Sequence, residues 1–382
     1  MTLLSKAQIA TQELEDRVIS YQDWAEKVLG SDYRDVFSDE YIRRSAKVFS
    51  IFLKHLEDMG DVEAEGEMQD MLAQLKAERI KIQTANLEYN AIQRAEARND
   101  LFNEQIIKAI ERLEPIKGAR PKLDVEPCDK HRTALLAISD LHAGSTFTVK
   151  GIYNEIVNEY SYDIMCARLW SIIDKIEADD IVFDDLTLAI CGDLVEGILR
   201  ESSLTKLREP VTDTVIRLAE FLSEWIYQLS SRLEKKVNVV IIGGNHDTVR
   251  SLTKIVVEFI KLRLQDLDWI TVDDYQDVAI KNIQGVNVMF QHGEDKDLKT
   301  TMDYFSNLYN IDVDEIVAGH LHRGESKTVG ITELGDRQLT RVGSIVGTDS
   351  YAKQIRASAR PSCYIALYEE DNGKTWSRNY YL

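Results

Sequence analysis

The stretch Ala134-Leu-Leu-Ala-Ile-Ser-Asp140-Leu-His142 joins a short apolar run to two polar residues that can bind a metal ion. An apolar run of this length predicts a buried β-strand. Asp140 and His142 follow the run and are two residues apart, so on an extended strand exit their side chains would point to the same side. The stretch therefore predicts a strand that presents a carboxylate and an imidazole at its end.

The same arrangement recurs four more times along the chain. Apolar runs at 186–191, 237–242, 286–291 and 315–318 each lead into a short polar motif. These motifs are Gly192-Asp193-Leu-Val-Glu196, Gly244-Asn245-His246-Asp247, Gln291-His292-Gly293 and Gly319-His320-Leu-His322. Polar residues just past strand ends are typical of α/β folds, whose sites lie in loops at the carboxyl ends of strands.

The motifs supply carboxylate, amide and imidazole groups. Asp193 can bridge two cations through its two oxygens, whereas Asn245 offers a neutral carbonyl oxygen. This ligand set suits Mn, Fe or Zn better than Mg or Ca. Two such cations about 3.5–4 Å apart would lower the pKa of a shared water and hold a phosphate for in-line attack. We therefore expect a hydrolase of phosphate esters with two divalent ions, manganese first and iron, zinc or magnesium as alternatives.

His246 is expected to act on the substrate, because its neighbour Asn245 is the expected metal ligand. Its predicted role is to donate a proton or a hydrogen bond to the leaving oxygen, while Asp247 holds the ring. His246 and Asp247 are therefore the predicted catalytic residues.

Together the five motifs resemble the signature of the calcineurin-like metallophosphoesterase superfamily: D-x-H, G-D, G-N-H-[DE], a histidine before a glycine, and G-H-x-H. The likeness covers about residues 134–322. It implies a two-sheet α/β/β/α sandwich with helices on its outer faces. It also implies two ligand sets that share one carboxylate: Asp140, His142, Asp193 and His322 for one ion, and Asp193, Asn245, His292 and His320 for the other.

Within this superfamily the chain departs from the protein serine/threonine phosphatases, which carry G-D-x-V-D-R-G and G-N-H-E. Here Glu196-Gly197-Ile198 stands where that signature has D-R-G, and Asp247 ends the third motif. Asp247 and the Gln291-His292-Gly293 motif resemble the nuclease and phosphodiesterase branches, including the Mre11/SbcD type of DNA exonuclease. The layout, a helical front followed by this domain, is similar to phosphoesterases of bacteriophage and prophage genomes.

The first third of the chain is predicted to be all-α. We predict a small helical domain over 1–60, a long helix for oligomerisation or spacing over 61–114, a proline-containing linker over 115–132 and the catalytic domain over 133–382. In the first domain, Arg43, Arg44 and Lys47 would lie on an exposed helix face. Two interpretations stay open: a helix-turn-helix that contacts DNA, or a small bundle for self-association with these residues as a solvated face.

The composition places further limits on function. A net charge of −19 argues against non-specific coating of nucleic acid. No apolar run reaches the roughly 18 residues of a membrane-spanning helix, and the N-terminus does not resemble a secretory signal. The four scattered cysteines are typical of a reducing cytoplasm, which is the expected location. Local basic residues still offer further nucleic-acid contacts: Arg250, Lys353, Arg356 and Arg360.

The expected function is therefore a two-metal phosphodiesterase or nuclease that acts on DNA and assembles as a homo-oligomer through its N-terminal helices. One alternative keeps the chemistry and changes the substrate to nucleotides or other small phosphate esters. A second alternative is a DNA-binding or scaffold protein with a catalytically silent metal site.

Overall fold

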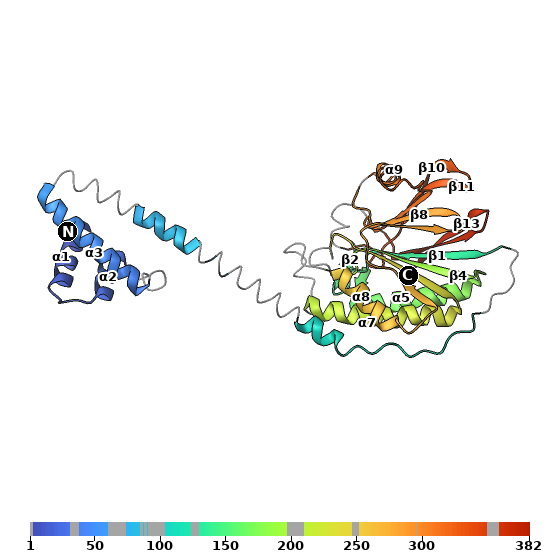
Figure 1. Cartoon of the computed structure of the whole chain (residues 1–382), viewed down its shortest axis with the longest axis horizontal. Coiled ribbons are helices and arrows are strands. Elements are labelled where there is room, and N and C mark those ends of the chain that lie inside the picture. Colours follow the sequence, from blue (N-terminus) through green and yellow to red (C-terminus); the bar gives the residue numbers. More distant parts are fainter. Residues whose placement is uncertain are drawn as a thin grey trace. The chain divides into compact units, whose positions relative to one another are not determined.

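The structure is a computed structural model of the 382-residue chain. It describes residues 3–30, 38–59, 74–84, 87, 90, 104–123, 130–196, 210–246, 252–295, 297–349 and 359–382. The chain divides into two compact units, Met1–Leu101 and Phe102–Leu382 (Figure 1).

The first unit is built around the indole of Trp24. Its helices are α1 (Leu3–Glu15), α2 (Tyr21–Leu29) and α3 (Asp39–Met59). Buried Trp24 donates Nε1–H to Thr11 Oγ1 at 3.0 Å and meets the ring of Phe49 edge-on at 6.1 Å. Ser20 begins α2 with a capping box, because Ser20 and Asp23 each accept a backbone N–H of the other. Side chains from all three helices thus form one small apolar core.

The outer face of α3 carries the predicted basic residues. Arg43, Arg44 and Lys47 are exposed, and Arg44 lies 3.1 Å from the carboxylate of Glu40. Residues 31–37, between α2 and α3, lie outside the described residues. Both interpretations of this unit, DNA contact and self-association, therefore stay predictions.

Part of the predicted long helix belongs to each unit. Residues 74–84 and 104–110 are helical, and most of the chain between them lies outside the described residues. Ile116 is buried in the second unit, where its N–H donates to the carbonyl of Arg263 at 2.8 Å. Some of the predicted linker is therefore packed against the helix α8 (Leu252–Leu264), and the domain limits stay predictions.

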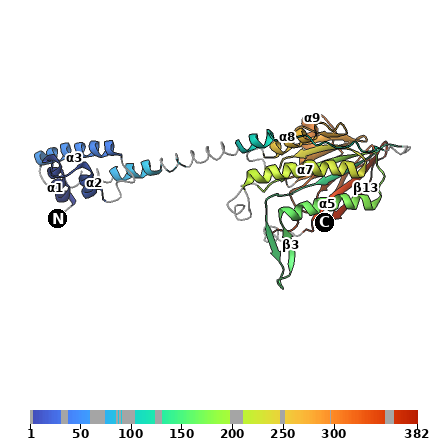
Figure 2. The ribbon, with the colours of Figure 1, turned by 90° about the horizontal axis from the view of Figure 1, so that it is seen from below.

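The second unit contains two large sheets and a separate two-stranded ribbon. The six-stranded sheet has the order β13 (Gly373–Tyr381), β12 (Ser362–Glu369), β1 (Arg132–Ile138), β4 (Asp185–Cys191), β5 (Lys236–Ile242) and β6 (Ile270–Val272). The five-stranded sheet has the order β10 (Glu325–Thr332), β11 (Gly335–Arg341), β9 (Glu315–Ala318), β8 (Val286–Gln291) and β7 (Ala279–Ile283). The ribbon pairs β2 (Phe147–Lys150) with β3 (Ile156–Tyr160) and projects from the unit (Figure 2).

The helices of this unit that are labelled in Figure 1 lie on the outer faces of the two sheets. They are α5 (Tyr162–Asp179), α7 (Val211–Leu233), α8 (Leu252–Leu264) and α9 (Leu298–Tyr309). Leu136 and Ile138 of β1 pack into the core with α5, α7 and α8, whereas Leu135 and Ala137 pack between the sheets. A further core around Met289 lies beneath α9. The implied α/β/β/α sandwich is therefore confirmed, and Figure 1 shows its layers.

Parallel pairing brings the motif-bearing strand ends to the same edge of each sheet. In the first sheet β1 pairs in parallel with β4, and β4 with β5. In the second, β9 pairs in parallel with both β8 and β11. The loops that leave these strands therefore start side by side, which is what gathers the polar motifs.

None of the helices that the structure describes has the length and apolarity that a membrane crossing requires.

Candidate metal centre

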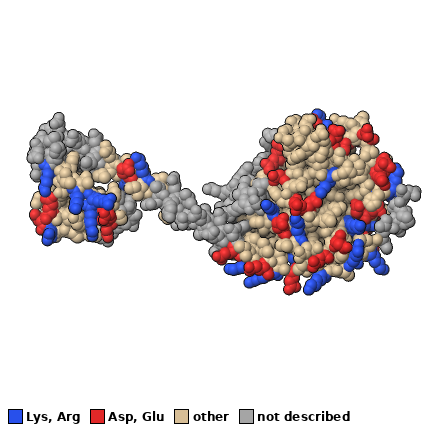
Figure 3. All heavy atoms as spheres, in the orientation of Figure 1, with Lys and Arg blue, Asp and Glu red and all other residues tan. Residues whose placement is uncertain are grey.

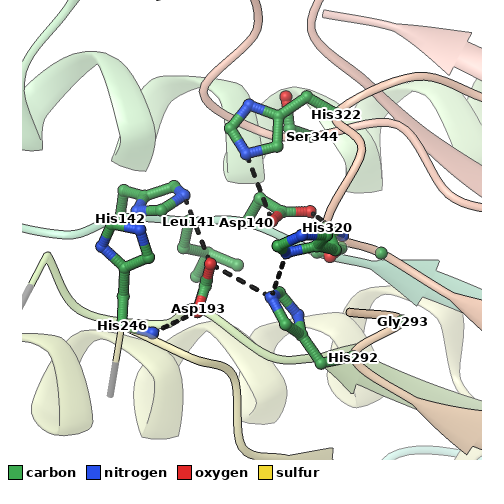
Figure 4. A network of polar contacts seen from close by, with 12 residues as sticks. Asp140, Leu141, His142, Asp193, His246, His292, Gly293, His320, His322 and Ser344 are labelled. Atoms are coloured by element: carbon green, nitrogen blue, oxygen red, sulfur yellow. Dashed lines mark hydrogen bonds and ion pairs between the residues drawn. The ribbon is translucent and has the colours of Figure 1, made fainter. Parts of the chain in front are cut away.

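The first two motif loops are joined through their backbones. After β1 ends, the N–H of Asp140 donates to the carbonyl of Gly192 at 3.1 Å, and the N–H of His142 donates to that of Asp193 at 2.9 Å. The parallel pairing of β1 with β4 thus continues beyond the strands. Figure 4 shows Asp193 between the rings of His142 and His246 on one side and that of His292 on the other.

The backbone at the motifs is left-handed, and the predicted extended strand exits are therefore wrong. Among the described motif residues other than glycine, five have positive φ: Asp140 at 55°, His142 at 44°, Asp193 at 52°, His320 at 71° and His322 at 58°. Such a φ is unfavourable for residues other than glycine and is concentrated at functional sites. Hydrogen bonds offset part of the cost, since the N–H of His320 donates to Asp140 Oδ2 at 3.1 Å.

One group of side chains converges on Nε2 of His292. Nδ1 of this ring donates to the carbonyl of Cys191 at 2.9 Å. Nε2 then lies 3.0 Å from Asn245 Oδ1, 3.1 Å from Asp193 Oδ2 and 3.2 Å from His320 Nδ1. These four side chains are the ones expected to hold one of the two ions.

A second group lies on the other side of Asp193. Nε2 of His322 is 3.3 Å from Asp140 Oδ1, and Nε2 of His142 is 3.7 Å from Asp193 Oδ2. The rings of His142 and His322 are 5.4 Å apart. Three sets of side chains have ligand atoms within 4.8 Å of one another: Asp140, His142 and His322; Asp193, His292 and His320; and His142, Asp193 and His246.

The donor atoms fit a cation. Because Nδ1 of His292 donates to a carbonyl, Nε2 of the neutral ring carries a lone pair, as do Asn245 Oδ1 and Asp193 Oδ2. In the neutral ring the lone pair of Nε2 would face these two oxygens and repel their lone pairs, and a proton or a metal cation at this place removes the repulsion. Among the described residues, the buried Nε2 of His142 has no hydrogen-bond partner, a deficit that coordination would satisfy.

Burial and charge oppose each other at these groups. Burial lowers the pKa of His292, but the hydrogen bond and charge of Asp193 raise it to about 10. Burial also lowers the pKa of His142, but Glu196 and two nearby aspartates raise it to about 9. Burial raises the pKa of Asp193, whereas the hydrogen bond and charges of the histidines lower it to about 2. In the metal-free protein, protons on the imidazoles thus balance the ionised carboxylates.

The site also contains Glu196, which is not among the residues predicted from the sequence to act in it. Its buried carboxylate lies 2.9 Å from Nδ1 of His142 and 3.6 Å from Nδ1 of His246. The rings of these histidines meet edge-on at 4.7 Å. Asp247, expected to hold His246, lies outside the described residues. The signal that could have identified Glu196 was its place in the second motif, three residues after Asp193.

The predicted nucleic-acid contacts are only partly described. Arg250, Lys353 and Arg356 lie outside the described residues. Arg360 is exposed, with its guanidinium 4.7 Å from the ring centre of Tyr381. The other candidates, Arg43, Arg44 and Lys47, belong to α3 of the first unit.

Comparison with known proteins gives a family for this chain. The family model of calcineurin-like phosphoesterases matches residues 133–326, and that of the YonJ coiled-coil domain matches residues 73–113. The SPbeta prophage-derived uncharacterized protein YonJ of Bacillus subtilis strain 168 is 25% identical over 338 residues, covering 83% of this chain and 80% of that protein. This relative agrees with the predicted likeness to prophage proteins, whereas the Mre11/SbcD resemblance stays a prediction.

Solved structures also show similarity, at low sequence identity. Vps29 from Entamoeba histolytica, in complex with zinc, is 14% identical with a TM-score of 0.31, covering 65% of this chain and 98% of its own. A dimetal phosphatase from Danio rerio is 9% identical with a TM-score of 0.34, again covering 65% of this chain and 98% of its own.

The matched family model spans the five motifs from Asp140 to His322. The motif side chains lie close enough together to form groups able to hold metal ions. The chain belongs to the calcineurin-like phosphoesterase family and is a metal-dependent phosphoesterase.

Proposed function

We propose that this protein is a phosphodiesterase that hydrolyses DNA with two divalent ions, manganese first among them. The observation that carries the proposal is the pair of ligand groups on either side of Asp193, drawn from separate strand ends. A single carboxylate with one group on each side is the arrangement that a two-metal site needs. When bound, the ions would supply an activated water and neutralise charge on the phosphate.

The proposed ligands are those expected from the sequence. Asp140, His142 and His322 would hold one ion together with Asp193, and three further side chains would hold the other. Those three are Asn245, His292 and His320. Asp193 belongs to both sets because its Oδ2 lies near Nε2 of both His142 and His292. The carbonyl of Cys191 fixes the proton of His292 on Nδ1 and so directs Nε2 toward the ion.

His246 is the proposed proton donor to the leaving oxygen. Its backbone N–H donates to Asp193 Oδ1 at 2.9 Å, which anchors the residue beside the metal ligands. Its side chain is 23% exposed, whereas that of His142 is 7% exposed, so the ring can reach a bound substrate. The carboxylate of Glu196 lies 3.6 Å from Nδ1 of His246, on the ring of the proposed donor.

DNA is the proposed substrate for two reasons. The second and third motifs depart from the protein-phosphatase signature at Glu196-Gly197-Ile198 and Asp247. Exposed Arg43, Arg44 and Lys47 on α3 offer contacts to phosphates.

Small phosphate esters are the second candidate substrate, because the described surface is not basic. Exposed Glu294 and Asp295 directly follow the His292-Gly293 motif. In Figure 3, acidic and basic side chains are interspersed over the visible face of the second unit. Carboxylates beside the centre would repel a polyanion more than a small ester.

A cleavage assay separates these functions. The full chain, loaded with Mn²⁺, is offered linear single- and double-stranded DNA and, separately, small phosphate diesters and monoesters. DNA cleavage that is absent from Asp193→Asn supports the proposal. Hydrolysis of small esters alone would favour the second candidate. DNA binding without turnover under Mn²⁺, Fe²⁺, Zn²⁺ and Mg²⁺ would instead indicate a scaffold protein with a silent site.

We further propose a homo-oligomer formed in the cytoplasm through the helical segment within 61–114. The match of residues 73–113 to a coiled-coil family model supports it, as does the exposure of Ile80 and Leu87, seven residues apart. Light scattering on the full chain tests the proposal. Replacing Ile80 and Leu87 together by lysine should lower the measured mass to that of one chain, whereas an unchanged mass would contradict the proposed interface.

A further inference from the structure

Arg341, the last residue of β11, is a buried cation that contacts two motif loops. Its side chain donates through Nη1 to the carbonyls of Gly293 at 3.1 Å and Gly319 at 3.3 Å. Through Nη2 it donates to the carbonyl of Asp295 at 3.0 Å. Arg341 is only 7% exposed, so its positive charge is stabilised by these carbonyl dipoles more than by water.

Strand register explains why one side chain reaches both loops. Arg341 is paired with Ala318 of β9, and Ala318 is paired with Gln291 of β8. All three are the last residues of parallel strands, so the next residues leave the sheet side by side. The guanidinium crosses the end of β9 to reach the carbonyl of Gly293 beyond it.

Gly293 leaves space for this contact. A Cβ at this position would lie 2.9 Å from the Cβ of Ala318 and 3.1 Å from Nη1 of Arg341. The φ of Gly293 is also +96°, which side chains rarely adopt. The glycine of the fourth motif therefore allows the guanidinium to approach the loop that carries His292.

The two loops held by Arg341 carry His292 and His320. Gly293 directly follows the first histidine, and Gly319 directly precedes the second. Their rings are 5.0 Å apart, and both belong to the ligand set proposed for one ion. The other set shares only His322 with these two loops. Its remaining ligands, Asp140, His142 and Asp193, are held by the hydrogen bonds that join the loops after β1 and β4 and by the contact of His142 with Glu196.

We propose that Arg341 is a positioning residue that fixes the spacing of His292 and His320 and thereby controls the affinity of one ion more than the other. The role rests on the proposed metal centre. Arginine suits it because its planar fork donates to several carbonyls at once in a fixed geometry. Lysine can reproduce the charge but not the fork.

The test is a calorimetric titration of the metal-free full chain with Mn²⁺. Wild type should bind two ions. Arg341→Met should bind one ion with wild-type affinity and the other about 10–100-fold more weakly, as is typical when support of a metal ligand is lost. Arg341→Lys should recover part of the difference. Gly293→Ala, which crowds the guanidinium from the other side, should weaken binding of the same ion.

Arg337→Met is the matched control. Arg337 lies on the same strand but donates to the carbonyl of Val313 at 3.0 Å and pairs with Asp303 at 2.9 Å. The Arg337→Met variant should therefore bind both ions with the affinity of the wild type. Circular dichroism verifies that each variant is folded, and Arg341→Lys and Gly293→Ala keep the proposal testable if Arg341→Met does not fold.

Two results would overturn the role of Arg341. One is wild-type affinity of folded Arg341→Met for both ions, and the other is an equal loss at both sites. DNA cleavage is measured separately. A wild type that binds two ions and cleaves no DNA contradicts the proposed substrate alone, whereas a wild type that binds no ion overturns both proposals.

Discussion

The carboxylate of Glu196 holds the ring of His142 from behind, with 2.9 Å between Oε2 and Nδ1. Because the carboxylate can only accept, the ring proton belongs on Nδ1, and Nε2 is left to face Asp193 Oδ2 at 3.7 Å. The other Glu196 oxygen lies 3.6 Å from Nδ1 of His246. One buried carboxylate thus orients a proposed metal ligand and contacts the proposed proton donor.

Replacing Glu196 by Gln should therefore weaken binding of the ion that His142 holds. The amide keeps the shape of the side chain but loses the charge that orients the ring and increases its basicity. We expect affinity for that ion to fall about 10–100-fold, as measured by Mn²⁺ titration. Glu177→Gln, which removes an exposed carboxylate paired with Arg232, is the control. Unchanged affinity in Glu196→Gln would mean that the contact does not support the metal site.

Asp193 and Asp140 should differ in how many ions they control. Asp193 Oδ2 lies near ligand nitrogens of both groups. Asp140 lies near the ligand nitrogen Nε2 of His322 through Oδ1, and its Oδ2 accepts the backbone N–H of His320, which is not a ligand atom. Asp193→Asn should therefore abolish binding of both ions, and Asp140→Asn should abolish binding of one. Bound metal per chain, measured after dialysis, distinguishes the two outcomes. Retention of two ions by Asp193→Asn would contradict the shared-ligand assignment.

The sequence predicted which residues gather but not how the backbone presents them. Apolar runs and motif order were enough to predict the strands and the family, because both depend on local pattern. The left-handed φ of Asp140 and His142 arises from hydrogen bonds to the loop after β4, about 50 residues away in sequence. The spacing of residues within one motif cannot predict hydrogen bonds to a distant loop. The predicted extended backbone after β1 was therefore wrong.

The roles of Glu196 and Arg341 were missed for the same reason. Glu196 meets His142 across two loops, and Arg341 reaches Gly293 across β9 from 48 residues away. Adjacency in sequence suggested Asp247 as the partner of His246. The structure places the carboxylate of Glu196 against His246, a contact that depends on tertiary packing.

His246→Ala should separate catalysis from metal binding. If His246 donates a proton to the leaving oxygen, its loss should slow turnover by roughly 10²–10⁴-fold while both ions stay bound. Turnover of the proposed DNA substrate and bound metal per chain are measured on the same sample. His246 also lies within ligand distance of His142 and Asp193. Loss of an ion from His246→Ala would therefore show that this histidine is a ligand and not the proton donor.

Metal loading should release protons, because ions and protons compete for the same imidazoles. In the metal-free protein the pKa of His142 is raised to about 9 and that of His292 to about 10, by carboxylates whose effect exceeds that of burial. Both rings therefore carry a second proton at pH 7.5 and must lose it to bind an ion. Asp193, with its pKa lowered to about 2, is already ionised and releases none.

Calorimetry in buffers of different ionisation enthalpy should accordingly detect about two protons released per chain at pH 7.5. The sign follows from the raised pKa values: apparent affinity for Mn²⁺ should increase with pH and level off once the pH exceeds about 10, where both rings are neutral. Glu196→Gln should reduce the release, because the carboxylate that raises the pKa of His142 is gone. An affinity that does not change between pH 7 and 9 would show that these imidazoles are neutral before the ions arrive.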